Sequence, residues 1–191
     1  MLEQLGVAHQ LLLPDLDEDS EALEAVQPNE APAAYVERVT QLKFDAALLR
    51  LKRRGMPMAP ILCSDTTVAL GRTIFGKPED DSDARRMLTE LSGRTHRVLT
   101  AVVLGTARRR EPALSVSRVT FASLTAAQIG RYVGSGEPMG KAGAYAVQGR
   151  AAAFISHLSG SYSGVMGLPM FETAALLRSF GIHSSVCKKI Y

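Results

Sequence analysis

Residues 61–70 read Ile61-Leu62-Cys63-Ser64-Asp65-Thr66-Thr67-Val68-Ala69-Leu70, and they carry the strongest structural signal in the chain. Apolar residues at both ends predict a buried strand that stops at Ser64 and resumes at Val68. An ionised carboxylate at such a place costs several kcal/mol unless a partner binds it. Asp65 is therefore either a turn or capping residue, or a functional group that acts as a general base or a metal ligand.

A hairpin is expected directly after this segment. Gly71-Arg72 predicts a tight turn between strands at 68–70 and 73–75. The second strand ends in Gly76-Lys77-Pro78, where Lys77 lies between a flexible and a rigid residue. A lysine held in this way suits phosphate oxygens, but the same residues also form ordinary hairpin exits. No P-loop or Gly-x-Gly-x-x-Gly motif occurs in the sequence, so P-loop and Rossmann folds lose their support.

A helix is expected before this segment, from about residue 32 to residue 52. Val36, Val39 and Ala46 recur at helical spacing. Lys43 falls on the same stripe, so its side chain either snorkels from the edge of the core or reaches into a cleft.

The other expected elements alternate without a strict βαβ rhythm. They are a strand at 7–13 followed by an acidic turn at 14–19, a helix from Asp81 or Ser82 to Gly93, strands at 97–104 and 114–121, a helix opened by a capping box at Thr125, a strand near 153–157 and a last helix after Pro169. This order favours an α/β fold with a mixed sheet over a doubly wound parallel sheet.

A glycine-rich segment at 134–149 contains Lys141, Tyr145 and Gln148. The Gln148 amide can donate and accept hydrogen bonds together, which reading the edge of a nucleotide base requires. The segment could equally be a loop whose small residues serve packing. A second glycine-rich stretch, at 159–164, could bind phosphate or merely turn the chain.

Composition limits the class of protein and of ligand. With 191 residues, 46% hydrophobic and 21% charged, the chain suits a globular domain rather than a disordered one. A net charge of +3 is too small to indicate nucleic acid but suits a polyanionic small molecule. Cys63 and Cys187 make no disulfide framework, and no stretch approaches the ~20 apolar residues of a membrane span, so we expect a cytoplasmic protein.

Taken in order, a series of motifs along nearly the whole chain resembles the Maf family of nucleoside triphosphate pyrophosphatases. The motifs are Tyr35-Val36-Glu37-Arg38 with Lys43, Ser64-Asp65-Thr66-Thr67-Val68, Gly76-Lys77-Pro78, Leu91-Ser92-Gly93-Arg94-Thr95-His96, Gly136-Glu137-Pro138, Lys141-Ala142-Gly143-Ala144-Tyr145, Gln148-Gly149, Gly160-Ser161-Tyr162 and Gly167-Leu168-Pro169. Each motif alone is modest, whereas their joint order and spacing are specific.

The resemblance implies a single domain over residues 1–191 with an ITPase-like (Maf/Ham1) mixed curved sheet, flanked by helices, and two lobes around a cleft. It also implies hydrolysis of a nucleoside triphosphate between the α and β phosphates, with a divalent cation, Mg²⁺ or Mn²⁺. The implied role is removal of non-standard or surplus nucleotides, with a link to arrest of cell division. A homodimer is expected, and neither a membrane nor a nucleic acid is an expected partner.

The resemblance also implies roles for individual residues of the catalytic centre. Asp65 matches the family's proton acceptor, and Lys77 and Lys43 match its phosphate-facing lysines. Asp17 aligns with another acidic position, so Asp17 and Asp65 are the expected metal ligands.

Thr66 and Gln148 resemble the dTTP/UTP branch of the family, and Lys141 is expected to bind substrate. The sequence lacks the family's first strand and its Ser-x-Ser-Pro-Arg-Arg loop, and we expect a start placed at an internal methionine. The alternative hypothesis is a catalytically impaired regulatory protein that binds nucleotides.

Overall fold

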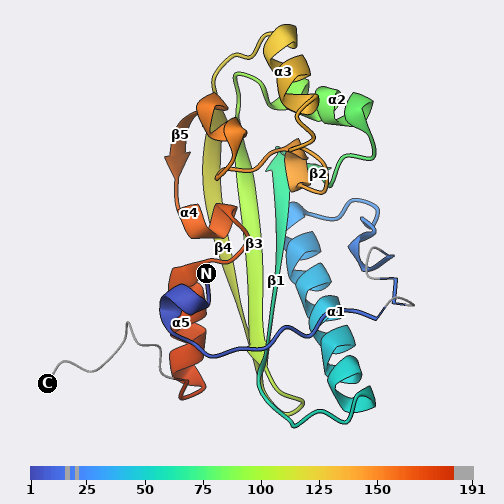
Figure 1. Cartoon of the computed structure of the whole chain (residues 1–191), viewed down its shortest axis with the longest axis vertical. Coiled ribbons are helices and arrows are strands. Elements are labelled where there is room, and N and C mark those ends of the chain that lie inside the picture. The colour runs from blue at the N-terminus through green and yellow to red at the C-terminus, as the bar shows by residue number, and fades with distance from the viewer. Residues whose placement is uncertain (16–17, 20–21, 183–191) are drawn as a thin grey trace, which may run out of the picture.

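The computed structural model describes residues 1–15, 18–19 and 22–182. Its centre is an open sheet of five strands in the order β2-β1-β3-β4-β5, and every pairing between them is antiparallel (Figure 1). The strands are β1 (Ile61–Leu70), β2 (Thr73–Phe75), β3 (Thr95–Gly105), β4 (Arg110–Phe121) and β5 (Ile155–Ser159). The α/β fold class predicted from the sequence is confirmed.

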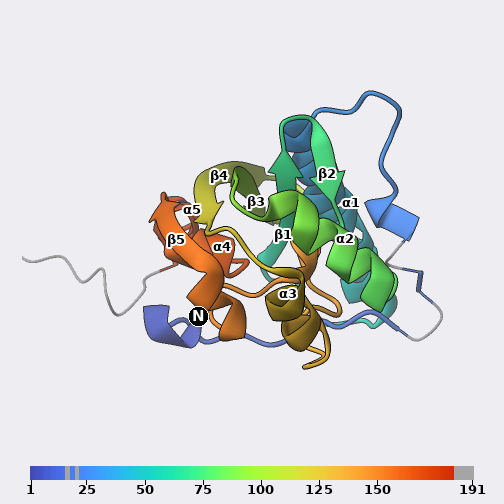
Figure 2. The same cartoon turned by 90° about the horizontal axis from the view of Figure 1, so that it is seen from above.

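Helices cover both faces of this sheet. They are α1 (Pro32–Arg53), α2 (Asp81–Leu91), α3 (Ala126–Val133), α4 (Tyr162–Val165) and α5 (Met170–Ser179), with short 3₁₀ turns at Glu3–Leu5, Ala22–Glu24, Ala142–Ala144 and Arg150–Phe154. Figures 1 and 2 show α1 on one side of the long strands and α4 and α5 on the other, with α2 and α3 at one end.

Alternation along the strands explains the two layers, because successive side chains of a strand point to opposite faces. On β3, Leu99 and Ala101 pack against α1, whereas Val102 and Leu104 pack against α5. Beyond them, Val98 joins the core beneath α2 and α3. The face of the sheet opposite α1 therefore has two separate apolar clusters, and polar side chains lie between them.

β1 is one continuous strand, so the expected interruption at residues 64–67 was wrong. Each residue from Ile61 to Ala69 pairs with β3, and these backbone hydrogen bonds keep the polar residues 64–67 in the strand. The short strand β2 pairs only with Val68–Leu70. Within the described part of the chain, the other edge of β1 at 61–67 has no strand beside it.

The strand expected at 7–13 was also wrong. That segment has no regular secondary structure, and Figure 1 shows it crossing the direction of the long strands, an orientation that prevents ladder pairing. Elsewhere the local signals were good. Gly71 (φ 61°) forms the β1–β2 turn, the capping box at Thr125 is present, and the second helix is capped by Asp80, one residue before the expected cap.

Among the residues that the structure describes, no helix is long and apolar enough to cross a membrane.

His96 on β3 is a buried titratable group in the core formed by β3, β4 and the loop that carries Tyr145. Its side chain is 1% exposed, its Nε2 lies 2.8 Å from the Tyr145 hydroxyl, and burial lowers its pKa to about 4. Since the pKa in the unfolded chain is near 6.5, the unfolded state binds the proton first as the pH falls. We expect this residue to cost about 3 kcal/mol of folding stability between pH 6.5 and pH 4.

Urea unfolding at a series of pH values measures this loss. His96→Gln, which does not titrate, should lose correspondingly less stability over the same range. Parallel stability curves for the two proteins would contradict the assignment.

Candidate active site

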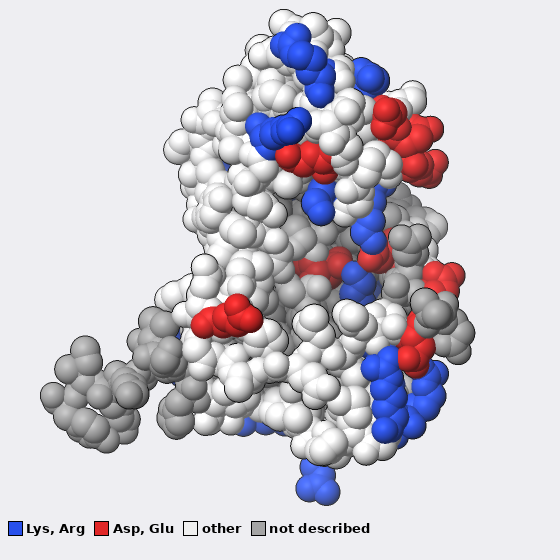
Figure 3. Space-filling model, in the orientation of Figure 1, with Lys and Arg blue, Asp and Glu red and all other residues white. Residues whose placement is uncertain are grey.

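A cavity of about 260 Å³ opens at the free edge of β1, between the ends of the two apolar clusters. Figure 3 shows a hollow in the middle of the molecule where basic and acidic side chains gather. The lining includes six residues that the sequence had singled out: Lys43, Asp65, Thr66, Lys77, Lys141 and Gln148. Segments that are distant in the sequence therefore converge on one pocket.

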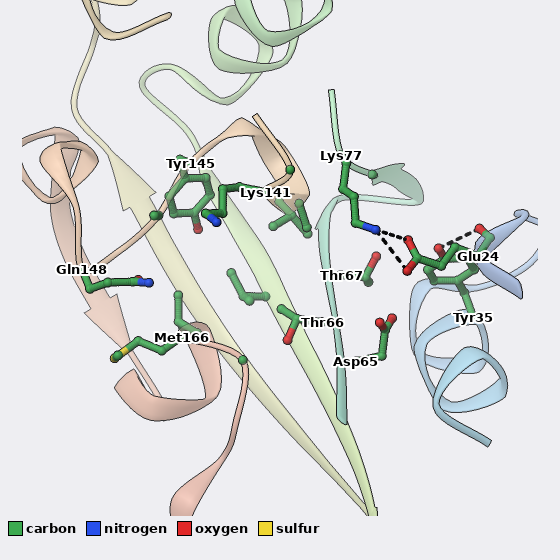
Figure 4. Close-up of a pocket in the computed structure, with 18 of the residues that line it drawn as sticks. Glu24, Tyr35, Asp65, Thr66, Thr67, Lys77, Lys141, Tyr145, Gln148 and Met166 are labelled. Atoms are coloured by element: carbon green, nitrogen blue, oxygen red, sulfur yellow. Dashed lines mark hydrogen bonds and ion pairs between the residues drawn. The ribbon is translucent and has the colours of Figure 1, made fainter. Parts of the chain in front are cut away.

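Alternation along β1 gives this pocket two chemically different ends. Asp65 and Thr67 point toward α1, whereas Thr66 points to the opposite face of the sheet (Figure 4). The pocket wraps around the free edge and so receives side chains from both faces. Both carboxylates, Lys43 and Lys77 gather on the α1 side, whereas the other side combines Lys141 with uncharged groups (Figure 4).

At the charged end, lysine ammonium groups and carboxylates form a connected set of ion pairs. Lys43 on α1 donates to Asp65 Oδ1 at 2.5 Å and to Glu24 Oε1 at 2.8 Å. Lys77, just after β2, lies 3.1 Å from Glu24 Oε2. The position of Lys43 settles the choice left open by its sequence pattern, because its ammonium reaches into the cleft.

Burial and charge set the pKa values of these groups. Burial raises the pKa of Asp65, and the adjacent Lys43 ammonium offsets only part of that rise. For Glu24, burial also acts upward, but hydrogen bonds from Lys43 and Lys77 outweigh it and lower the pKa. Burial alone would lower the pKa of Lys43, yet its two carboxylate partners raise it. The pKa values of the two carboxylates at this site are therefore shifted in opposite directions, upward for Asp65 and downward for Glu24.

Glu24 is a member of the charged cluster that the sequence did not reveal. The Tyr35 hydroxyl on α1 donates to the Glu24 backbone carbonyl at 2.9 Å and so fixes the turn that carries it. No periodicity or motif marks Glu24, because the 3₁₀ turn that carries it, ahead of α1, is only three residues long. Asp17, the acidic residue that the resemblance indicated instead, lies outside the described residues.

The loop that carries Lys141 is tied to the loop that carries Lys77. The Gly143 N–H donates to the Gly76 carbonyl at 3.0 Å. Gly143 has φ 69°, and a Cβ there would lie 2.9 Å from Val68 Cγ1, so only glycine fits this close approach. This contact holds Lys141 at the rim of the pocket.

The other end of the pocket combines apolar surface with hydrogen-bonding groups. Tyr145, Gln148 and Met166 surround it on the same side as Thr66 (Figure 4). A flat heterocycle could contact this surface while a polyanion lies near Lys43 and Lys77.

The fold and the site define an α/β protein whose pocket has lysines and carboxylates at one end and apolar and hydrogen-bonding groups at the other, an arrangement suited to a phosphorylated ligand. The chain belongs to the family of Maf-like proteins, because the family model matches residues 1–180.

Curated relatives agree with this membership. The chain is 76% identical over 181 residues to a protein of Albidiferax ferrireducens named dTTP/UTP pyrophosphatase, covering 95% of this chain and 90% of the relative. Proteins with the same name from Polaromonas sp. and Cupriavidus metallidurans are 68% and 62% identical, over 95% and 96% of this chain and 90% and 92% of their own lengths.

Proposed function

We propose that this protein is a nucleoside triphosphate pyrophosphatase that hydrolyses dTTP and UTP to the monophosphate and pyrophosphate. The observation that carries the proposal is the Asp65–Lys43–Glu24–Lys77 cluster at one end of a pocket whose other end suits a base. The names of relatives at 62–76% identity support the same reaction and substrates.

In the proposed reaction Asp65 is the general base. Its carboxylate takes a proton from water as the water oxygen attacks the α-phosphorus, and the bond from that phosphorus to the bridging oxygen breaks. Pyrophosphate then leaves with the electron pair of that bond. A raised pKa makes Asp65 a stronger base than an ordinary aspartate.

The two lysines are proposed to act through their charge. Lys43 orients the Asp65 carboxylate through their hydrogen bond, and Lys77, which lines the same pocket, is proposed to contact the phosphate chain. Both ammonium groups stabilise negative charge that develops on the phosphate oxygens in the transition state. Lys141 and Gln148 are proposed to bind substrate farther along the pocket, with Gln148 at the base.

The donor set at the charged end fits a hard divalent cation such as Mg²⁺ or Mn²⁺. Glu24 and Asp65 present only carboxylate oxygens, and Mg²⁺ is commonly held by one or two carboxylates together with substrate phosphates. Among the described residues no group of three or more His, Cys, Asp or Glu side chains could hold a metal ion, so the proposal assigns the remaining ligands to substrate phosphates. A bound cation would neutralise phosphate charge. Asp17 remains a further proposed ligand.

Assay of the purified chain with UTP and dTTP tests the proposal. We expect one UMP and one pyrophosphate per UTP consumed, activity that depends on added Mg²⁺ or Mn²⁺, and loss of activity with EDTA. Release of UDP and inorganic phosphate would contradict the proposal. Nucleotide binding without turnover would instead support the alternative of an impaired regulatory protein.

The cytoplasmic location, the homodimer and the link to cell-division arrest remain predictions from the family resemblance.

A further inference from the structure

Three oxygen atoms lie in a chain at the end of the pocket that Thr66 and Gln148 line. Thr66 on β1 pairs with Thr100 on β3, and their hydroxyl oxygens are 2.9 Å apart. The Thr100 hydroxyl is also 2.7 Å from the carbonyl oxygen of Gly164 on α4. Thr100 is 1% exposed, whereas Thr66 lines the pocket.

Counting hydrogens fixes the direction of this chain. A carbonyl oxygen can only accept, so the single hydroxyl hydrogen of Thr100 lies on its bond to Gly164. The contact between the two hydroxyls then requires Thr66 to donate and Thr100 to accept. The hydrogen of Thr66 is thereby used inside the protein, and its oxygen has only lone pairs to offer the pocket.

The accepting carbonyl is itself held in place. Gly164 O also accepts the N–H of Gly167 at 2.9 Å, and Gly164 N donates to the Ser161 hydroxyl, which caps α4, at 3.0 Å. Because this acceptor is anchored in helix α4, the Thr100 hydroxyl has a fixed partner and the orientation of Thr66 is preset.

We propose that Thr100 is a specificity-determining positioning residue, which makes the Thr66 hydroxyl a pure hydrogen-bond acceptor toward the base. This inference rests on the proposed function and deepens it. Thymine and uracil carry an N–H at ring position 3, which an acceptor satisfies. Cytosine carries an unprotonated nitrogen there, so its lone pair would face the lone pairs of Thr66. The pocket therefore selects for bases with N3–H through the orientation of one hydroxyl.

Thr100→Val tests the proposal, because valine keeps the shape and removes the hydroxyl. The Thr66 hydrogen then becomes available to the N3 of cytosine. We expect the ratio of kcat/KM for UTP to that for CTP to fall about tenfold. Thr100→Ser, the matched control, should keep the ratio of the wild type. If Thr100 had a purely structural role, Thr100→Val would lower kcat/KM for UTP and for CTP by the same factor. An unchanged ratio in Thr100→Val would overturn the proposal.

Two further measurements guard against a variant that folds poorly. In a Thr66→Val background, Thr100→Val should leave the UTP-to-CTP ratio unchanged, since no hydroxyl remains to be oriented. The second measurement needs no variant. The wild-type protein should hydrolyse 3-deaza-CTP, in which a C–H replaces N3, faster than CTP. Equal kcat/KM values for those two nucleotides would also overturn the proposal.

The outcomes separate this inference from the function beneath it. Failure of the wild type to release pyrophosphate from UTP refutes the proposed function. In that case the selectivity for UTP over CTP is measured by calorimetry instead, as the ratio of their Kd values in the wild type and in Thr100→Val. Turnover of UTP with equal selectivity in the two proteins refutes only the role of Thr100.

Discussion

Asp65→Asn should lower kcat for UTP by about 10²–10⁴-fold, the range attributed to a positioned general base. Asparagine keeps the size of the side chain but cannot take a proton from water. Steady-state pyrophosphate release measures the effect. In the wild type, kcat/KM should fall with a slope of one as the pH drops through the pKa of Asp65, which burial places above that of an ordinary aspartate.

Stability provides the control for Asp65→Asn. The folded-state pKa of Asp65 is raised, so the native state holds the proton more tightly than the unfolded chain, and ionised Asp65 costs stability at neutral pH. The variant should therefore unfold at the same temperature as the wild type or higher. Asp45→Asn is the matched carboxylate control and should retain full activity, because Asp45 forms an exposed ion pair with Arg110 and does not line the pocket. Near-wild-type turnover by Asp65→Asn would show that Asp65 is not the general base.

Lys43→Met should lower kcat/KM for UTP by about 10²–10³-fold, as expected for loss of one preorganised cationic donor. Methionine fills similar space but leaves Glu24 and Asp65 without the ammonium that they share. Because Lys43 now lowers the pKa of Asp65, its loss should move the acidic limb of the pH profile to higher pH.

Comparison with a lysine elsewhere on α1 separates this local effect from loss of charge. Lys52→Met, at the exposed end of the helix, removes the same charge from the chain and should leave both kcat/KM and the pH profile unchanged. An acidic limb that stays in place in Lys43→Met would show that Lys43 does not set the basicity of Asp65.

The sequence predicted the elements that have strong local signals. The helix α1 follows from its apolar spacing, the β1–β2 hairpin from Gly71, and the start of α3 from the capping box at Thr125. These features depend on neighbours a few residues away, so a single sequence contains them.

Features that depend on distant partners were predicted less well. The pattern around Asp65 indicated an interrupted strand. The pairing with β3 that keeps these polar residues in the strand involves residues more than 25 positions away, so the local sequence does not indicate it. Glu24 escaped notice for the same reason, since its place in the site comes from Lys43, Lys77 and the hydroxyl of Tyr35.

The roles of individual site residues came from the family resemblance rather than from spacing. Read as residues alone, Lys43 and Gln148 each had a purely structural alternative, and only the folded chain brings both to one pocket. The direction of the Thr66–Thr100 bond could not be predicted at all, because it follows from a third group, the Gly164 carbonyl.

Hydrolysis of UTP in water enriched in oxygen-18 follows the attacking oxygen to its product. If water activated by Asp65 attacks the α-phosphorus, one labelled oxygen should appear in UMP and none in pyrophosphate, as read by mass spectrometry after a single turnover. Label in pyrophosphate with unlabelled UMP would place the attack at the β-phosphorus and contradict the proposed reaction.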